Sequence, residues 1–364
     1  MLLKRMLQLS LLLTFIVILL GAYTRLADAG LGCPDWPGCY GQLSVPNSEL
    51  EIAQANHLFP ALTVETDKAW LEMIHRYFAG SLGVLVFAIS VIAIVQKQVG
   101  RLLPVLVSVV VVFQALLGMW TVTMKLMPLV VMGHLLGGFT LFSLLALLYW
   151  QVRASECSHA ALEQELEPNV AHLVHNTKQR ISPNSSVIKI IAVLALILLV
   201  MQIVLGGWTS SNYAALMCTE LPICQGQWRD YLDFSTAFQL IQPSQESYEF
   251  GTLDYGARMT IHVMHRFGAM VISLVLISLI WQLFKQESLP CQHQAKWLTG
   301  LLALQLMLGI SNVVFSLPIV VAVAHNLGAA LLLLNVLYIN HLLWQSTPKT
   351  SALGMRVGKE AYHE

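Results

Sequence analysis

Long apolar runs separated by short polar segments dominate the pattern of this chain. A membrane-spanning helix needs about 20 mostly apolar residues, and eight runs come close to or exceed that length. They lie at 6–24, 71–95, 102–121, 129–151, 187–208, 259–284, 297–317 and 319–344. The pattern therefore predicts an all-α polytopic membrane protein with eight transmembrane helices.

The composition agrees with this prediction. Of the 364 residues, 56% are hydrophobic and only 11% are charged, which is more apolar surface than a water-soluble domain could cover. The formal net charge is zero, so the overall electrostatics give no ground to expect a nucleic acid as partner. Membrane lipid is the expected surrounding.

The first apolar run imitates a cleaved signal peptide. It follows Lys4 and Arg5 and ends near Ala27-Asp28-Ala29, which resembles a cleavage site. The run is longer than the apolar part of a typical signal peptide, and the same run followed by cysteines recurs in mid-chain. We therefore expect the first span to be retained.

Basic residues are distributed unequally between the two sides of the predicted helices. One side carries thirteen: Lys4, Arg5, Lys97, Arg101, Arg153, Lys178, Arg180, Lys189, Lys285, Lys296, Lys349, Arg356 and Lys359. The other side carries five: Arg25, Lys68, Lys125, Arg229 and Arg258. The positive-inside rule then places both termini in the cytoplasm.

The cysteines fit this orientation. Cys157 and Cys291 fall on the inner side, where thiols stay reduced. The other four fall on the outer side, where disulfides persist: Cys33, Cys39, Cys218 and Cys224.

The two halves of the chain match each other. At an offset of 185, GAYTRLADAGLGCPDWPGCYGQ (21–42) matches GGWTSSNYAALMCTELPICQGQ (206–227), and at 190, MIHRYFAG (73–80) matches VMHRFGAM (263–270). At 191, the matches are Gln114 with Gln305, Gly118 with Gly309, His134 with His325 and Gly137 with Gly328. Because each half has an even number of spans, we expect a parallel internal repeat of two pseudo-symmetric four-helix bundles.

This duplication divides the chain into four parts. The linker is polar, and we expect it to include a short surface helix. The expected parts are an N-terminal bundle at 1–151 with an outer loop at 25–70, a cytoplasmic linker at 152–186, a C-terminal bundle at 187–345 with an outer loop at 209–258, and a cytoplasmic tail at 346–364.

Four predicted spans carry a histidine within about two turns of their outer ends, namely His75, His134, His265 and His325. A single intramembrane histidine is usually a hydrogen-bonded structural residue, but duplicated pairs favour ligands because ionisable groups at this depth are costly. Zinc would need three or four protein ligands, whereas each half offers two imidazoles from separate helices. Two facing imidazoles suit the axial positions of a haem iron held between helices.

Other residues near these histidines have two interpretations each. Arg76 and Arg266 could meet haem propionates, or could extend to the membrane interface. Gln114 and Gln305 are interpreted as making helix–helix hydrogen bonds, with a substrate role as the less favoured alternative. Nearby glycines could leave room for a macrocycle or allow close helix packing: Gly80, Gly83, Gly137, Gly138, Gly268 and Gly328.

The two halves differ at one informative position. Glu72 stands three residues before His75, while His262 stands three before His265. Residues three apart share a helix face, so Glu72 would face whatever His75 binds and could act as a general base or stabilise positive charge. The first half would then transform its haem while the second holds an electron-transfer haem. Alternatively, Glu72 only caps the first turn of its span.

At these residues the chain resembles the haem A synthase (CtaA/Cox15) family of eight-span membrane enzymes. The segments that carry the resemblance are GAYTRLADAGLGCPDWPGC, EMIHRYFAG, MGHLLGG, MHRFGAM and AHNLGAA, and together they cover nearly the whole chain. The resemblance implies oxidation of the C8 methyl group of haem O to a formyl group, which gives haem A for terminal oxidase biogenesis.

The resemblance also implies residue roles. Glu72 would be the catalytic carboxylate, with His75 and His134 as the axial ligands of the substrate haem. His265 and His325 would ligate the iron of a haem B cofactor. The outer cysteines would form the disulfides Cys33–Cys39 and Cys218–Cys224, with a redox or docking role for these loops left open.

The expected location is a bacterial cytoplasmic (inner) membrane, because MLLKRMLQLS leads directly into the first span without a transit peptide. Partners that this interpretation allows are haem O synthase, oxidase assembly factors and a second copy of the chain. A diheme b-type cytochrome that exchanges electrons with quinone would use the same four histidines and is the first alternative. A transporter with parallel repeats is disfavoured, because the span interiors are plain Leu, Val and Ile.

Overall fold

The computed structural model describes residues 2–97, 99–164, 185–221, 224 and 228–345. Among these residues, eight helices are long and apolar enough to cross a membrane, which confirms the predicted all-α class and its eight spans. They are α1 (Leu2–Leu26), α3 (Thr66–Gln96), α4 (Leu102–Thr123), α5 (Pro128–Gln164), α7 (Ser185–Ser211), α9 (Tyr255–Phe284), α10 (Leu289–Val314) and α11 (Ile319–Gln345).

The remaining elements are short and lie between the long helices. They are α2 (Glu49–Leu58), the 3-10 helix η1 (Trp228–Tyr231) and α8 (Phe234–Ala237). No strand is present in the part of the chain that the structure describes, apart from an isolated bridge between Cys39 and Gln42.

Several helix ends follow from local sequence. Prolines stand at or just before the first turn of α4, α5, α10 and α11, where their missing N–H group costs nothing, namely Pro104, Pro128, Pro290 and Pro318. Each of the eight long helices is longer than its predicted apolar run. The polar residues Thr66 and Asp67 already belong to α3, and α5 continues beyond 151 to Gln164. The rest of the predicted linker, at 165–184, and the tail at 346–364 lie outside the described residues.

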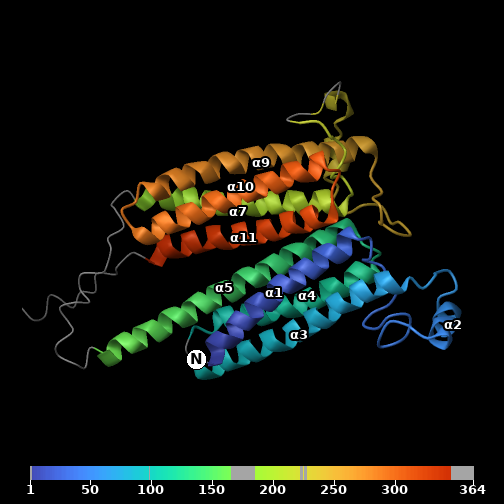
Figure 1. Ribbon diagram of the computed structural model, residues 1–364, viewed down its shortest axis with the longest axis horizontal. Coiled ribbons are helices and arrows are strands. Elements are labelled where there is room, and N and C mark those ends of the chain that lie inside the picture. The colour runs from blue at the N-terminus through green and yellow to red at the C-terminus, as the bar shows by residue number, and fades with distance from the viewer. Residues whose placement is uncertain (1, 98, 165–184, 222–223, 225–227, 346–364) are drawn as a thin grey trace, which may run out of the picture.

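The long helices form two groups of four (Figure 1). In one group α1 packs on α3, α3 on α4, α4 on α5 and α5 on α1, and in the other α7, α9, α10 and α11 contact one another in the same cyclic order. Between the groups, α5 contacts α7, α11 contacts α1, and α5 contacts α11. Exchanging the two groups leaves this set of contacts unchanged, as a twofold repeat requires.

Unusual backbone geometry recurs at the sequence offsets of the repeat. Positive φ angles are uncommon for residues other than glycine. Lys125 and Leu126 adopt them between α4 and α5 (52° and 61°), and Ser316 and Leu317, 191 positions later, adopt them between α10 and α11 (55° and 61°). Asp28 after α1 (49°) likewise matches Tyr213 after α7 (52°). These matches agree with the internal repeat, which stays a prediction.

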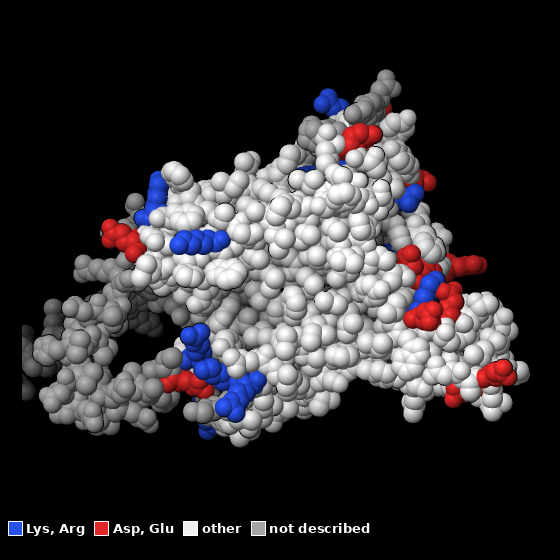
Figure 2. Space-filling view, viewed as in Figure 1, with Lys and Arg blue, Asp and Glu red and all other residues white. Residues whose placement is uncertain are grey.

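The outer faces of the helices are suited to lipid. Val84 on α3 and Leu274 on α9 are 74% and 69% exposed, and they are typical of many outward-facing apolar side chains. Figure 2 shows a middle band without charged side chains on the visible face, with basic groups gathered where α1 begins and acidic groups gathered beside α2. We call the end of the helices beside α2 the loop end, because the segments 27–65, 212–221 and 228–254 lie there.

A polar contact links the two helix groups at the loop end. The Arg25 guanidinium of α1 donates to the Tyr213 hydroxyl (2.7 Å) and to the Ser210 carbonyl at the end of α7 (3.2 Å). It also lies 4.1 Å from the centre of the Tyr213 ring, within the range of a cation–π interaction.

Replacing Arg25 by leucine should lower the free energy of unfolding by about 1–3 kcal/mol, because charged hydrogen bonds and ring stacking are lost together. Thermal unfolding of the detergent-solubilised protein would measure this. Arg229→Leu is the matched control, since Arg229 stacks only on its own neighbour Trp228 at an exposed site. Equal stability of Arg25→Leu and Arg229→Leu would show that the contact contributes nothing.

Candidate functional site

Each of the four candidate histidines lies against a glycine of the neighbouring helix. A Cβ atom on Gly21 of α1 would come within 2.9 Å of the His75 ring, and one on Gly118 of α4 within 3.4 Å of the His134 ring. In the second group, Gly206 of α7 faces His265 at 3.1 Å, and Gly309 of α10 faces His325 at 3.2 Å. The glycines therefore provide the space in which the four imidazoles lie.

The rings are arranged in two pairs. His75 on α3 and His134 on α5 are close enough to interact electrostatically, and so are His265 on α9 and His325 on α11. The Nδ1 atoms of His75, His134 and His325 are buried without a hydrogen-bond partner among the described residues. Such nitrogens are free to bind another group.

Glutamines hold the rings of the second pair. Gln202 of α7 donates its amide to the His265 carbonyl (2.9 Å) and contacts Nδ1 of the same residue (3.0 Å). Gln305 of α10 donates to the His325 carbonyl (3.0 Å) and lies 3.4 Å from the ring Nε2. The predicted helix–helix hydrogen bond of Gln305 is thus confirmed.

Three of the glycines that could leave room for a macrocycle or allow close helix packing lie against glutamine amides of the neighbouring helix. A Cβ atom on Gly268 would overlap Gln202, one on Gly328 would overlap Gln305, and one on Gly137 would overlap Gln114. A Cβ atom on Gly80 or Gly83 would meet nothing within 4 Å, so these two glycines do not mark close helix packing among the described residues.

Glu72 is buried at the loop end of α3, with 5% of its surface exposed. Its carboxylate accepts a hydrogen bond from the Cys33 backbone N–H (2.9 Å) and pairs with the guanidinium of Arg76. Because α3 begins at Thr66, Glu72 lies in the second turn, and its alternative role as a cap of the first turn is wrong. In the second group the matching His262, also 5% exposed, contacts the Ala214 carbonyl through Nδ1 (2.9 Å).

Arg76 and Arg266 bind the two cysteine loops. Arg76 donates to the carbonyls of Asp35 (3.0 Å), Pro37 (3.2 Å) and Gly38 (2.6 Å). Arg266 donates to the carbonyls of Cys218 (2.5 Å) and Glu220 (2.7 Å). Both guanidinium groups are thus held by loop carbonyls, and their contact with haem propionates or with the membrane interface stays a prediction.

Both predicted disulfides are present, Cys33–Cys39 and Cys218–Cys224. The first is fully buried and packs with Tyr40, Val45 and Met73. Burial raises the pKa of the Tyr40 hydroxyl above its ordinary value, and this hydroxyl donates to the Thr63 carbonyl (3.1 Å). The first loop is therefore a packed cover on the end of α3.

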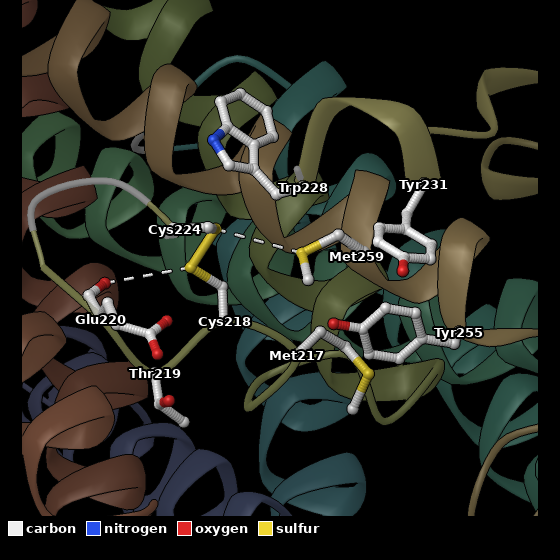
Figure 3. A pocket seen from close by; sticks show the side chains of 9 residues that line it. All are labelled: Met217, Cys218, Thr219, Glu220, Cys224, Trp228, Tyr231, Tyr255 and Met259. Carbon is white, nitrogen blue, oxygen red and sulfur yellow. Dashed lines mark hydrogen bonds between the residues drawn. A yellow bond between two sulfur atoms is a disulfide. The ribbon is translucent and has the colours of Figure 1, made fainter. Parts of the chain in front are cut away.

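A cavity of about 240 Å³ lies beside the second disulfide (Figure 3). Met217, Met259 and the disulfide present sulfur atoms to it, and aromatic rings surround them. None of the four candidate histidines lines this cavity, so it is separate from the predicted haem sites.

The paired rings suit haem better than a bare metal ion. In the part of the chain that the structure describes, no group of three or more His, Cys, Asp or Glu side chains could hold a metal ion. Two buried imidazoles from different helices, some with unpartnered nitrogens, are instead the donor set that a haem iron takes. The residues present therefore fit the predicted group.

Sequence reasoning missed two features of the site. The glycines that face the histidines appeared only as matches of the repeat, although their spacing from the helix ends could have indicated a role. Gln202 was missed because its counterpart at an offset of 185 is Val17, so the comparison of halves gave no signal there.

Comparison with known proteins gives consistent matches. A family model, COX15-CtaA, described as a cytochrome oxidase assembly protein, matches residues 4–337. A heme A synthase of Shewanella oneidensis is 49% identical over 346 residues, which cover 95% of this chain and 98% of that protein. Heme A synthases of Nitrosospira multiformis (24% identical, 90% of each chain) and Mesorhizobium japonicum (25% identical, 89% of this chain and 85% of that protein) are also similar.

Replacing Arg76 by methionine should destabilise the protein by about 3 kcal/mol or more, because a buried carboxylate loses its counter-ion and the loop loses its anchor. Thermal unfolding and the rate of proteolysis within 27–65 would measure this. Lys68→Met is the control, since the Lys68–Glu65 pair is solvent-exposed and such pairs contribute about 0–1 kcal/mol.

The double variant Arg76→Met, Glu72→Leu should recover part of that loss, because no unpaired charge then stays buried. If the double variant is as unstable as the sum of both single changes, the ion pair is not what holds this region together.

Proposed function

Because the chain belongs to the COX15-CtaA family, we propose that it is a haem A synthase, which oxidises the C8 methyl group of haem O to the formyl group of haem A. The 49% identity to a protein of that name over nearly the full length of both chains supports this activity over a non-catalytic diheme cytochrome. Haem O as substrate and haem A as product follow from the activity.

The two helix groups would divide the work. His75 and His134 would ligate the substrate haem in the N-terminal bundle, 1–151, and His265 and His325 would ligate haem B in the C-terminal bundle, 187–345. The observation that carries this assignment is the difference between Glu72 and His262 at matched positions. Among the described residues at these matched positions, a buried carboxylate precedes His75 by three residues and a buried imidazole precedes His265.

Glu72 is placed to handle protons during the oxidation. Conversion of a methyl to a formyl group removes protons and electrons from the carbon and adds an oxygen atom, and a bound haem B would supply the path for electrons. A buried carboxylate can take up a proton as a general base, and the hydrogen bond from Cys33 together with the Arg76 pair fixes its position. The cysteine loop thereby orients the catalytic carboxylate.

The location proposed for the protein is a bacterial cytoplasmic membrane, with both termini in the cytoplasm and the loop end outside. The excess of basic residues on the opposite side supports this orientation. The bacterial origin of the similar proteins supports the membrane. Haem O synthase, oxidase assembly factors and a second copy of the chain are the partners proposed for the exposed loops.

Glu72→Gln should leave haem bound but lower haem A formation by about 10²–10⁴-fold, because the general base is lost. The measurement is extraction of pigments from purified protein, made in a host that supplies haem O, with each haem identified by mass. His262→Gln is the matched control, with haem A formation within a few-fold of the parent. Haem B alone in the parent protein, or undiminished haem A in Glu72→Gln, would contradict the proposal.

A further inference from the structure

We propose that Gln202 and Gln305 are positioning residues that fix the rings of His265 and His325, and that the lack of equivalent contacts at His75 and His134 lets the N-terminal bundle exchange its haem. This inference rests on the proposed function, since it explains why one haem is retained as cofactor while the other enters as substrate and leaves as product.

Each glutamine contacts its histidine at two points. The amide of Gln202 bridges the backbone carbonyl and the ring of His265, and the amide of Gln305 does the same at His325. The carbonyl fixes where the amide lies, and the amide in turn limits rotation of the ring. A ligand that is held in this way loses little further freedom when its ring binds a metal.

A glutamine amide can form a hydrogen bond with a histidine ring nitrogen whether or not that nitrogen carries a proton. An amide N–H donates to a bare ring nitrogen, and an amide oxygen accepts from a protonated one. The Oε1 atoms of both glutamines are buried and have no hydrogen-bond partner within the described chain. For His265, the contact of Gln202 with Nδ1 leaves Nε2 as the nitrogen that could bind iron.

The first helix group lacks both contacts. On α1, Val17 takes the place of Gln202, and on α3, Phe78 takes the place of Gly268, so no amide reaches His75. Gln114 of α4 does lie against Gly137, but its Nε2 and the His134 Nδ1 are both unpartnered among the described residues. Among the described residues, neither ring of the N-terminal bundle is therefore held by a glutamine amide, although the His75 ring contacts the Val17 backbone.

This difference has a kinetic consequence. Outer partners of metal-bound histidines typically contribute about 10–100-fold to affinity. Differences in affinity between related sites arise mostly from the rate of release. The C-terminal bundle would therefore release its haem slowly, and the N-terminal bundle would release its haem quickly enough for turnover.

The test uses the full-length protein in detergent with its haem, in a His75→Ala background so that only the C-terminal bundle binds haem. Gln202→Leu and Gln305→Leu should each lose haem to an excess of apomyoglobin about 10–100-fold faster than the parent. Gln114→Leu is the matched control and should leave this rate unchanged. Haem loss at the parental rate in both variants would overturn the inference.

The midpoint potential separates ring positioning from general stability. The amide Nε2 of Gln202 contacts Nδ1 of His265, so its loss in Gln202→Leu should shift the midpoint potential of the haem. Gln202→Glu puts a carboxylate oxygen in place of Nε2, which makes the ring more basic and should lower the potential. If both variants keep the parental potential, Gln202 does not act through the ring, whether or not the leucine variant is stable.

A gain-of-contact variant tests the other half of the inference. Val17→Gln combined with Phe78→Gly would build the missing contact on His75, and should slow haem release from the N-terminal bundle about 10-fold. Val17→Leu combined with Phe78→Gly opens the same space without an amide and should release haem at the parental rate. Equal release from both double variants would contradict the role of the amide.

Failure of the proposed function would look different. In that case the parent protein would contain no haem B, or His265→Ala would retain it. If His265→Ala loses haem B while the glutamine variants behave like the parent, only the positioning role is wrong.

Discussion

Each candidate ligand in this fold occupies space that a side chain on the adjacent helix would otherwise fill. His75, His134, His265 and His325 all lie over a glycine, and the helix pairs involved are equivalent in the two groups. An imidazole between two packed helices requires such a gap, because protein interiors leave few voids. The positions of the four rings, and the pairing of helices around them, therefore depend on where these glycines stand.

The differences between the two groups are concentrated around His75. Glu72 replaces a histidine, Val17 replaces a glutamine, and Phe78 replaces a glycine. Glu72 is also connected to the surface, because Arg76 binds it and three loop carbonyls at once. A change in the conformation of the loop around Cys33 would therefore move the Glu72 carboxylate through the Arg76 guanidinium. In the other group Arg266 also binds its cysteine loop, but among the described residues no carboxylate takes the place of Glu72 beside His265.

The spans and the paired cysteines could be predicted from sequence because they depend on local composition and on similarity between the halves. The start of α3 could not, since Thr66 and Asp67 are polar and the apolar pattern begins only at 71. That error led to the capping alternative for Glu72. The roles of Gly137, Gly268 and Gly328 stayed open between room for a macrocycle and close helix packing, because a glycine in a sequence does not say which side chain fills the space opposite. Gln202 was overlooked because only one copy of the repeat has it.

The contact between Arg25 and Ser210 joins two different residues at matched positions. An assembly of two identical subunits could not form such a contact. Arg25 binds the carbonyl of Ser210, which is the residue at its own matched position in the other group. In a symmetric dimer both subunits carry the same residue at every site, so an arginine there would face a second arginine across the twofold axis. In the predicted internal repeat both copies belong to one chain, which removes that restriction and lets the two sides differ.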